Sequence, residues 1–157
     1  MVYLITVPYV PTPHEVVRKM LKLADLKPGE VVLDLGCGDG RVLVIAAKEF
    51  GAKAIGIELR RDLVEAAMRN VLEAGVEDKV MILHGNFFEM KLPEADVIFL
   101  YLLTSVNERL KPKLEKEAKP GTRIVSHDFE IVGWKPEKVV EVRDGGRSHR
   151  IYLYVVR

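Results

Sequence analysis

A chain of 157 residues, 48% of them hydrophobic, is long enough to bury one sizeable core, which excludes an intrinsically disordered protein. The formal net charge of +1 excludes strong overall attraction to nucleic acid or to an acidic membrane. Cys37 is the only cysteine, which excludes an intrachain disulfide and a metal cluster built from several cysteines.

The charge is distributed unevenly along the chain. Residues 1–108 contain 12 Lys and Arg against 16 Asp and Glu, whereas residues 109–123 contain 6 against 2. We interpret the basic segment 109–123 as solvated surface, although weak contact with a nucleic acid through it stays open. Glutamine is absent and 30% of the residues are charged, a balance typical of proteins from hot environments.

No feature of the sequence indicates a membrane or a secreted protein. Hydrophobic runs stay well short of the roughly 20 residues that span a bilayer. The apolar start, MVYLITVPYVPTP, has no basic region before it. We therefore expect a cytoplasmic protein without a membrane partner. Residues 1–157 are predicted to form a single domain, with residues 1–12 as an extended arm, and the oligomeric state stays open with a monomer favoured.

Short β-rich segments alternate with helical patterns, which predicts a layered α/β sheet. Thr12 is expected to cap a helix that has Pro13 in its first turn and ends by residues 27–29. Strands are then predicted over residues 31–35, 53–57, 79–83, 96–102 and 122–126, and helices from the glycines through residue 50 and over residues 62–74 and 106–118. Pro112 is expected to break or restart the last helix. Two final strands, residues 138–143 and 149–156, flank Asp144-Gly145-Gly146-Arg147, which predicts a hairpin.

The first predicted strand ends in a glycine-rich turn, VVLDLGCGDGR over residues 31–41. Gly36, Gly38 and Gly40 allow a ligand to approach the backbone closely, at the start of a helix whose N–H groups point toward it. Glu58 ends the second strand about twenty residues later, where an acid can accept both hydroxyls of an adenosine ribose. The pattern therefore predicts a cofactor that contains adenosine.

The spacing of the glycines indicates which cofactor binds. Dinucleotide-binding folds favour G-x-G-x-x-G, which leaves room for a pyrophosphate, but the spacing here is G-x-G-x-G and Asp34 precedes it. A carboxylate at that position repels phosphate and can hold an ammonium group. S-adenosylmethionine, which has an amino-acid end, a ribose and no phosphate, fits these residues best.

At this motif, residues 32–40, the chain resembles the class I, seven-strand methyltransferases, and its C-terminal hairpin matches their last two strands. The resemblance implies a Rossmann-like α/β fold, with helices on both faces of a mixed sheet of order 3-2-1-4-5-7-6 and strand 7 antiparallel. It places Asn86 and Phe87 beside the adenine. Cys37 is then a small residue fitted into the cofactor turn, and Leu59 joins Glu58 among the residues expected to bind the cofactor.

The segment that follows the fourth strand narrows the choice of acceptor. It lacks the Asn/Asp-Pro-Pro-Tyr/Phe motif of enzymes that methylate base or glutamine amides, and a catalytic cysteine for pyrimidine chemistry is absent. His127 and Asp128 give only a weak indication of a metal, so no metal site is predicted. An aliphatic amine is attractive, because it attacks a sulfonium methyl without a metal once the protein aligns and desolvates it.

Segments along nearly the whole chain resemble the archaeal broad-specificity protein-lysine methyltransferases. The most specific is Val7-Pro8-Tyr9-Val10-Pro11-Thr12-Pro13, and the others lie within residues 85–88, 102–107, 110–117, 126–134 and 152–155. The resemblance implies transfer of methyl groups from S-adenosylmethionine to exposed lysines on many proteins, without a large substrate domain. An RNA or small-molecule methyltransferase of the same fold would share every cofactor feature and stays the alternative.

Under this interpretation, aromatic side chains line a narrow lysine channel and face the sulfonium: Tyr9, Phe87, Tyr101, Phe129 and Trp134. Phe129 and Trp134 are equally compatible with the core, whereas Tyr101 ends a central strand, where ligands bind in such sheets. Asp128 and Glu130 are placed to attract a cationic side chain. The resemblance further implies that the arm closes over the cofactor, with Tyr9 near the transferred methyl and the Thr12 hydroxyl near the amino-acid end. Tyr9 and Tyr101 are the candidate catalytic residues, and Asp128, Phe129 and Trp134 the candidate substrate-binding residues.

Overall fold

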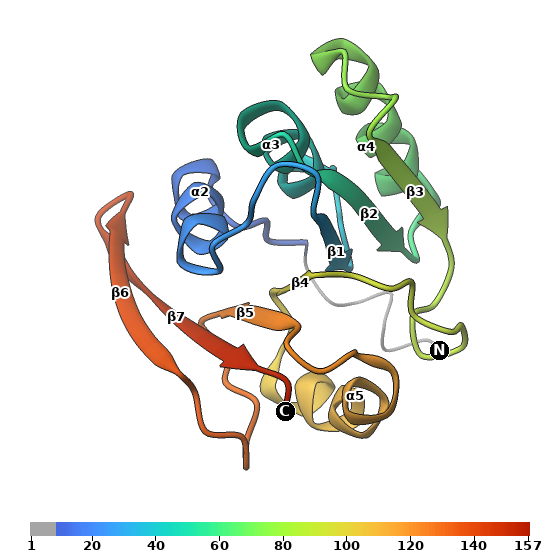
Figure 1. The fold of residues 1–157 in the computed structure, drawn as a ribbon. Helices are drawn as coiled ribbons and strands as arrows, with labels where there is room; N and C mark the ends of the chain where they lie inside the picture. Colours follow the sequence, from blue (N-terminus) through green and yellow to red (C-terminus); the bar gives the residue numbers. More distant parts are fainter. Residues whose placement is uncertain (1–8) are drawn as a thin grey trace.

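A computed structural model describes residues 9–157, which form one seven-stranded sheet with helices on both faces (Figure 1). The helices are α2 (His14–Leu23), α3 (Arg41–Phe50), α4 (Arg61–Ala74) and α5 (Thr104–Glu117). The strands are β1 (Val31–Leu35), β2 (Lys53–Glu58), β3 (Val80–His84), β4 (Val97–Leu100), β5 (Arg123–His127), β6 (Lys138–Asp144) and β7 (Arg147–Val155). Residues 1–8 of the predicted arm, 1–12, lie outside the described residues.

The strand order is β3-β2-β1-β4-β5-β7-β6. The first five strands run parallel, and β7 lies antiparallel between β5 and β6. The sheet order, the antiparallel seventh strand and the closing hairpin expected from the sequence are therefore confirmed. A parallel pair needs a crossover connection, whereas an antiparallel pair can be joined by a short turn, which is what residues 144–147 provide.

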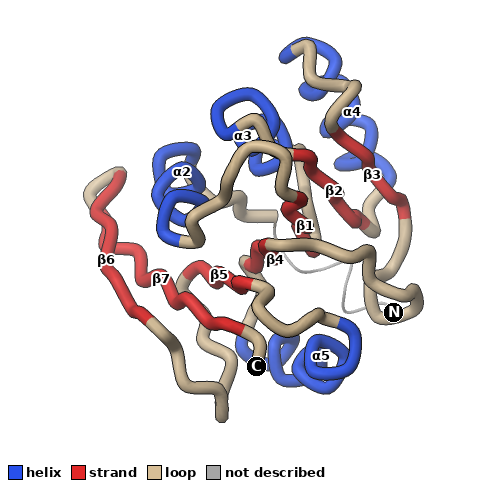
Figure 2. The backbone as a smooth tube through the Cα atoms, viewed as in Figure 1, coloured by secondary structure: helices blue, strands red, loops and turns tan. Residues whose placement is uncertain are grey.

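The two faces of the sheet are covered by different helices. α2, α3 and α4 lie on one face and α5 lies on the other (Figures 1 and 2). Along β1, Val32 belongs to the core beneath α2 and α3, whereas Leu33 and Leu35 belong to the core beneath α5. Because side chains alternate along a strand, Asp34 shares the α3 face with Val32.

Glycines end two of the helices, as the sequence predicts. Gly51 follows α3 and Gly75 follows α4, with left-handed φ angles of 67° and 70°. Residues with a Cβ adopt this conformation only with strain, so glycine at these positions marks where the helix stops.

Three local expectations are wrong. Thr12 does not cap α2: Pro13 is the N-cap residue, and the Thr12 hydroxyl bonds His127 instead. Pro112 does not interrupt α5, because Leu110 and Leu114 on either side of it are fully buried and hold the helix against the sheet. β4 is shorter than predicted, because its partner β1 ends opposite Leu100.

The arrangement of the strands gathers chemically useful side chains at one edge of the sheet. The carboxyl ends of the parallel strands meet there, and Glu58, Tyr101 and Asp128 lie at or just after the ends of β2, β4 and β5. Open α/β sheets bind ligands at this edge. Within residues 9–157, every helix is too short or too polar to cross a bilayer.

Replacing Pro112 by Ala is expected to raise the free energy of unfolding by about 1–3 kcal/mol, because proline at this exposed position withholds a backbone N–H from the helix. Denaturant unfolding would measure the change. Glu115→Ala, another exposed substitution in α5, serves as the control and should shift stability by no more than about 0.5 kcal/mol. An unchanged or lower stability of Pro112→Ala would contradict the view that burial of Leu110 and Leu114 offsets a real cost.

Candidate active site

The glycine turn, residues 36–40, lies directly against the end of β2. The backbone N–H groups of Gly36 and Cys37 both donate to the Ile57 carbonyl, at 2.8 and 3.0 Å. The three glycines have left-handed φ angles of 84°, 55° and 81° at Gly36, Gly38 and Gly40. Because α3 starts immediately after the turn, its unpaired N–H groups and its positive dipole end face this edge of the sheet.

Cys37 points into the core. A Cβ on Gly56 would lie 2.6 Å from the Cys37 sulfur and 2.7 Å from Leu43 Cδ1, so Gly56 leaves the space that these side chains fill. Burial, with the Asp34 carboxyl nearby, raises the pKa of the Cys37 thiol, which keeps it protonated and unreactive. The sequence predicts a small residue that fits into the turn at this position, and the buried Cys37 side chain agrees with that prediction.

Glu58 joins the glycine turn to the end of β2. The side chain is 7% exposed, and its two carboxylate oxygens accept the N–H groups of Gly38 at 2.8 Å and Arg60 at 2.9 Å. Each oxygen keeps a second lone pair, so Glu58 can hold the turn and still accept two hydroxyls from a ligand. Leu59, the next residue, is 47% exposed, and its carbonyl accepts a hydrogen bond from His84 Nε2 at 3.0 Å.

Asp34 is a buried carboxyl that has no partner among the described residues. It is 4% exposed, and no residue of the described range 9–157 offers it a hydrogen bond or an ion pair. Burial, together with the nearby Glu58 and Asp39 carboxylates, raises the pKa of Asp34 well above its usual value. An unpaired carboxyl beside a second acid favours a cationic ligand, so these residues fit a molecule with an ammonium group and a ribose.

The arm lies over the glycine turn. A Cβ on Gly38 would meet the Tyr9 ring at 2.7 Å, and the Tyr9 hydroxyl accepts the Asp39 N–H at 3.1 Å. Arg41 fastens the following stretch by donating to the Thr12 carbonyl at 3.2 Å while it pairs with Asp39 at 2.7 Å. The structure thus brings Tyr9 and Thr12 to the turn, as the resemblance implies, and their roles toward a ligand stay predictions.

The segment after β3 supplies an aromatic surface. Asn86 Oδ1 accepts the Phe88 N–H at 2.9 Å, which shapes the turn and leaves the Asn86 amide N–H groups available. The Phe87 and Phe88 rings lie 4.8 Å apart and are both partly buried. The Arg109 guanidinium sits 4.3 Å from the centre of the Phe88 ring, so Phe88 has a structural role and Phe87 is the ring left for a base.

Tyr101 lies at the centre of a second aromatic group. Its ring stacks on His127 at 4.0 Å and on Phe129 at 6.1 Å. Burial, with the Asp128 carboxylate, raises the pKa of the Tyr101 phenol. Trp134 is partly buried and packs edge-on against Tyr154, a member of the core beneath α5. The structure therefore brings Phe129 to Tyr101 and packs Trp134 against the core.

Asp128 is held in a strained and well-anchored position. Its φ angle is +63°, unusual for a residue with a Cβ. Its carboxylate lies 3.0 Å from the Arg147 guanidinium and accepts the Arg150 N–H at 3.1 Å. Burial opposes ionisation, but these contacts outweigh it and lower the pKa of Asp128. Much of its charge is thereby committed to Arg147 rather than to an incoming cation.

The sequence alone missed two residues near Tyr101. His149 of β7 bonds His127 of β5 at 2.8 Å, and one ligand atom from each of these histidines and from Asp128 lies within 4.8 Å of the others. Asn107 of α5 is 1% exposed and donates to the carbonyls of Phe129 and Glu130, which fixes the loop after β5. His149 begins a predicted strand and His127 directly follows another, but the register that joins the two histidines was not visible in the sequence.

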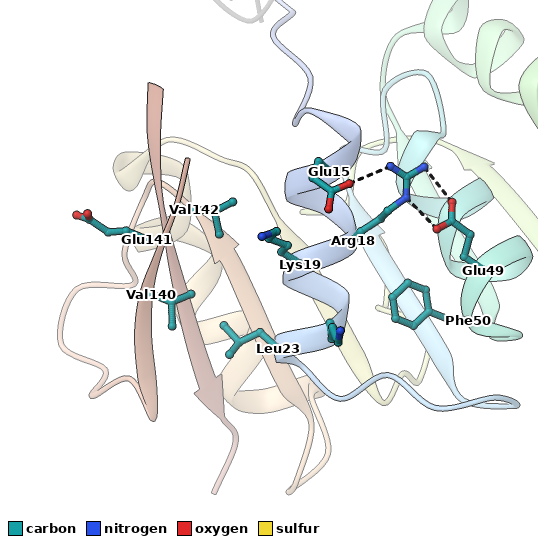
Figure 3. Close-up of a pocket in the computed structure, with 10 residues that line it drawn as sticks. Glu15, Arg18, Lys19, Leu23, Glu49, Phe50, Val140, Glu141 and Val142 are labelled. Carbon is teal, nitrogen blue, oxygen red and sulfur yellow. Dashed lines mark hydrogen bonds and ion pairs between the residues drawn. The ribbon is translucent and has the colours of Figure 1, made fainter. Parts of the chain in front are cut away.

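A large groove lies away from this edge, between α2, α3 and β6 (Figure 3). Its volume is about 810 Å³, with Leu23, Phe50 and Val140 among the lining residues and Arg18 paired to Glu49 at 2.8 Å. None of the predicted site residues lines it. We therefore assign the chemistry to the edge with the glycine turn.

Comparisons with known sequences agree with this assignment. The family model described as the ANTKMT methyltransferase domain matches residues 34–138. A protein-lysine N-methyltransferase of Saccharolobus islandicus (strain REY15A) is 52% identical over 157 residues, which cover 99% of this chain and 98% of that protein. The adenine nucleotide translocase lysine N-methyltransferase of Mus musculus is 34% identical over 151 residues, which cover 96% of this chain and 63% of the mouse protein.

Among solved structures, the RNA methyltransferase from Salinibacter ruber, in complex with S-adenosyl-L-homocysteine, is 45% identical. It superposes with a TM-score of 0.89 over 94% of each chain. The fold is thus shared with relatives whose names specify different acceptors.

Asp34→Asn is expected to raise the melting temperature of the ligand-free protein and to weaken binding of S-adenosylmethionine about 10- to 100-fold. The folded-state pKa of Asp34 is raised. Its contribution to stability is therefore present below its unfolded pKa of about 3.9 and is lost as the pH rises through the folded value. The amide removes that destabilisation at neutral pH, but it cannot pair with an ammonium group.

Thermal melts and calorimetric titration would measure the two effects. Asp78→Asn, at an exposed position before β3, is the control and should change neither quantity. Unchanged affinity in Asp34→Asn would remove Asp34 from the binding site.

Proposed function

This chain belongs to the ANTKMT methyltransferase family, and we propose that it transfers methyl groups from S-adenosylmethionine to lysine ε-amines of proteins. The family recognised from the sequence is confirmed. The observation that carries the lysine assignment is the 52% identity, over the full chain, with a protein-lysine N-methyltransferase. A broad range of protein substrates, as the sequence resemblance implies, is part of the proposal.

The residues at the glycine turn fit this cofactor. S-adenosylmethionine supplies a methyl group on a positively charged sulfur, which is a good leaving group. Glu58 accepts the two ribose hydroxyls with its free lone pairs, and Asp34 pairs with the ammonium group. The Phe87 ring packs against the adenine, and the Asn86 amide hydrogen-bonds it. Tyr9 covers the turn from the arm, in contact with Gly38.

The aromatic group at the end of β4 suits the acceptor. An amine attacks only when it is uncharged, and removing it from water lowers the pKa of its ammonium form. The Tyr101 and Phe129 rings exclude water and present electron-rich faces to positive charge. Since burial raises the pKa of the Tyr101 phenol, the phenol stays uncharged at neutral pH and can accept a hydrogen bond from the lysine. Tyr9 and Tyr101 remain the proposed catalytic residues.

An RNA acceptor is the alternative, favoured by the name of the 45% identical structure. The basic segment 109–123 offers little free charge for it. Four of its cations form ion pairs within the protein: Lys111 with Glu108, Lys113 with Glu117, Lys119 with Glu94 and Asp96, and Arg123 with Glu30. Arg109 stacks on Phe88. We therefore favour protein substrates over RNA. A cytoplasmic location and a monomeric enzyme, both expected from the sequence, stay part of the proposal.

Incubating the purified protein with labelled S-adenosylmethionine and total cell extract is expected to place the label on protein lysines, located by mass spectrometry. Activity should rise with pH, because the uncharged lysine amine is scarce below its pKa of about 10.4. Nuclease-treated extract is the control and should be labelled equally. Label that disappears with nuclease, or that lies on arginine, would overturn the lysine assignment.

Tyr9→Phe is expected to reduce turnover about 2- to 10-fold, since it removes one hydrogen bond to the Asp39 N–H. Tyr9→Ala should reduce it more, because the ring over Gly38 is lost as well. Tyr9 is 40% exposed, so both variants should keep the wild-type melting temperature. Equal activity of Tyr9→Ala and wild type would remove the arm from the active site.

A further inference from the structure

A file of hydrogen bonds runs from the arm through the sheet to the C-terminal hairpin. Thr12 Oγ1 lies 3.0 Å from His127 Nδ1, and His127 Nε2 lies 2.8 Å from His149 Nδ1. His149 Nε2 lies 3.3 Å from the Asp144 carbonyl oxygen. The three side chains are nearly inaccessible, at 4%, 0% and 2% exposed for Thr12, His127 and His149. We call these residues the histidine file.

The direction of each hydrogen bond in the file follows from its last member. A carbonyl oxygen only accepts, so His149 Nε2 carries a proton and donates to Asp144. An uncharged His149 then has a lone pair on Nδ1, so His127 Nε2 must donate to it. An uncharged His127 has a lone pair on Nδ1, so the Thr12 hydroxyl donates to His127. Every polar atom in the file is satisfied with both rings uncharged.

The surroundings of His127 keep it uncharged at neutral pH. The groups that face it are Thr12 from the arm, Tyr101 stacked at 4.0 Å, His149 and Arg147 from β7, and Asp128 at 3.6 Å. Burial is the main influence and lowers the pKa of His127 to about 4, with Asp128 opposing the shift and His149 and Arg147 adding to it. At neutral pH the His127 ring therefore carries one proton, on Nε2, and does not take up a second.

A metal ion explains the same atoms less well. The two histidine nitrogens that would face it already lie 2.8 Å apart, in a direct hydrogen bond. Asp128 Oδ2, the nearest carboxylate oxygen to His127, is 3.0 Å from the Arg147 guanidinium. A divalent ion would have to break the first contact and compete with a cation for the second. Hydrogen bonds account for the cluster without either change.

We propose that the histidine file positions two residues for methyl transfer. It directs the Thr12 hydroxyl proton toward His127, and it stacks the uncharged His127 ring against Tyr101. The inference rests on the proposed function. With its proton committed to His127, Thr12 presents only oxygen lone pairs to anything else nearby. Those lone pairs suit the ammonium end of S-adenosylmethionine. An uncharged His127 also avoids placing a positive charge next to a cationic cofactor and a cationic substrate.

The Thr12 hydroxyl tests the file at its functional end. Thr12→Val keeps the shape of the side chain but removes the donor and the lone pairs, and should weaken cofactor binding about tenfold or more. The loss should appear in the Kd and KM for S-adenosylmethionine, with little change in the KM for the protein substrate. Thr12→Ser restores a hydroxyl and should recover most of the affinity.

Thr122→Val is the matched control. Thr122 is 1% exposed, and its hydroxyl donates to the Ala95 carbonyl at 3.3 Å. Thr122 and Ala95 precede β5 and β4, so they lie at the edge of the sheet opposite the glycine turn. This variant should lose stability and keep the wild-type cofactor affinity. If Thr12→Val binds the cofactor as tightly as wild type does, the inference is wrong. Wild-type protein that binds no cofactor would instead overturn the proposed function, so the two failures are distinguishable.

The ring nitrogens give a readout that a purely structural role would not fix. Long-range proton–nitrogen spectra of the full-length protein at pH 7 should show His127 uncharged, with its proton on Nε2, and His149 with its proton on Nε2. The nitrogen shifts of His127 should stay constant as the pH falls toward 5 and change near pH 4, where the ring takes up a second proton. A charged ring, or a proton on Nδ1 of either histidine at pH 7, would contradict the proposed direction of the file.

Discussion

The close approach of the glycine turn to the end of β2 is the constraint on which the rest of the structure depends. The Ile57 carbonyl accepts two N–H groups of the turn, and the Glu58 carboxylate accepts a third from Gly38. The approach is possible because Gly56 leaves room for Cys37 beneath the turn. It sets the point where α3 starts, and it leaves Gly38 open for the Tyr9 ring. A larger side chain at position 56 or 38 would therefore disturb the helix, the acid and the arm together.

Electrostatics divides the site into two halves. At the glycine turn, Asp34 lies buried near Glu58 with no partner within residues 9–157, a costly arrangement that a cation relieves. At the end of β4, burial keeps His127 uncharged beneath the Tyr101 ring. In the proposed reaction both the cofactor and the protonated substrate are cationic. A negative charge where the cofactor is held, and an uncharged His127 next to Tyr101, suit that pair.

The comparisons with known proteins constrain the cofactor more tightly than the acceptor. Relatives at 52% and 45% identity share the fold but bear names with different acceptors, a protein lysine and an RNA. The glycine turn is therefore not what separates them. In this chain most cations of the basic segment 109–123 form internal ion pairs, such as Lys119 with Asp96 and Arg123 with Glu30. In the proposed function, the few residues around Tyr101 and Phe129 select the acceptor.

The sequence by itself determined the features that depend on neighbouring residues. Short β-rich segments predicted most of the strands, and glycines predicted the turn and the ends of α3 and α4, because backbone conformation at these positions is a local property. Asp34 and Glu58, the acids proposed to bind the cofactor, could be identified because each lies at or next to the end of a strand. The sheet order came from resemblance to a family, since pairing of distant strands leaves no local pattern.

Only the tertiary structure decided which distant side chains meet. The partner of Thr12 is His127, 115 positions away, so the expected helix cap was wrong. The partner of His127 is His149, and that contact depends on how β7 lies against β5. Phe129 stacks on Tyr101 whereas Trp134 packs against Tyr154 of the core, although both residues follow β5. These outcomes depend on strand register and on the space left by packing, which are set by the whole fold rather than by any short segment.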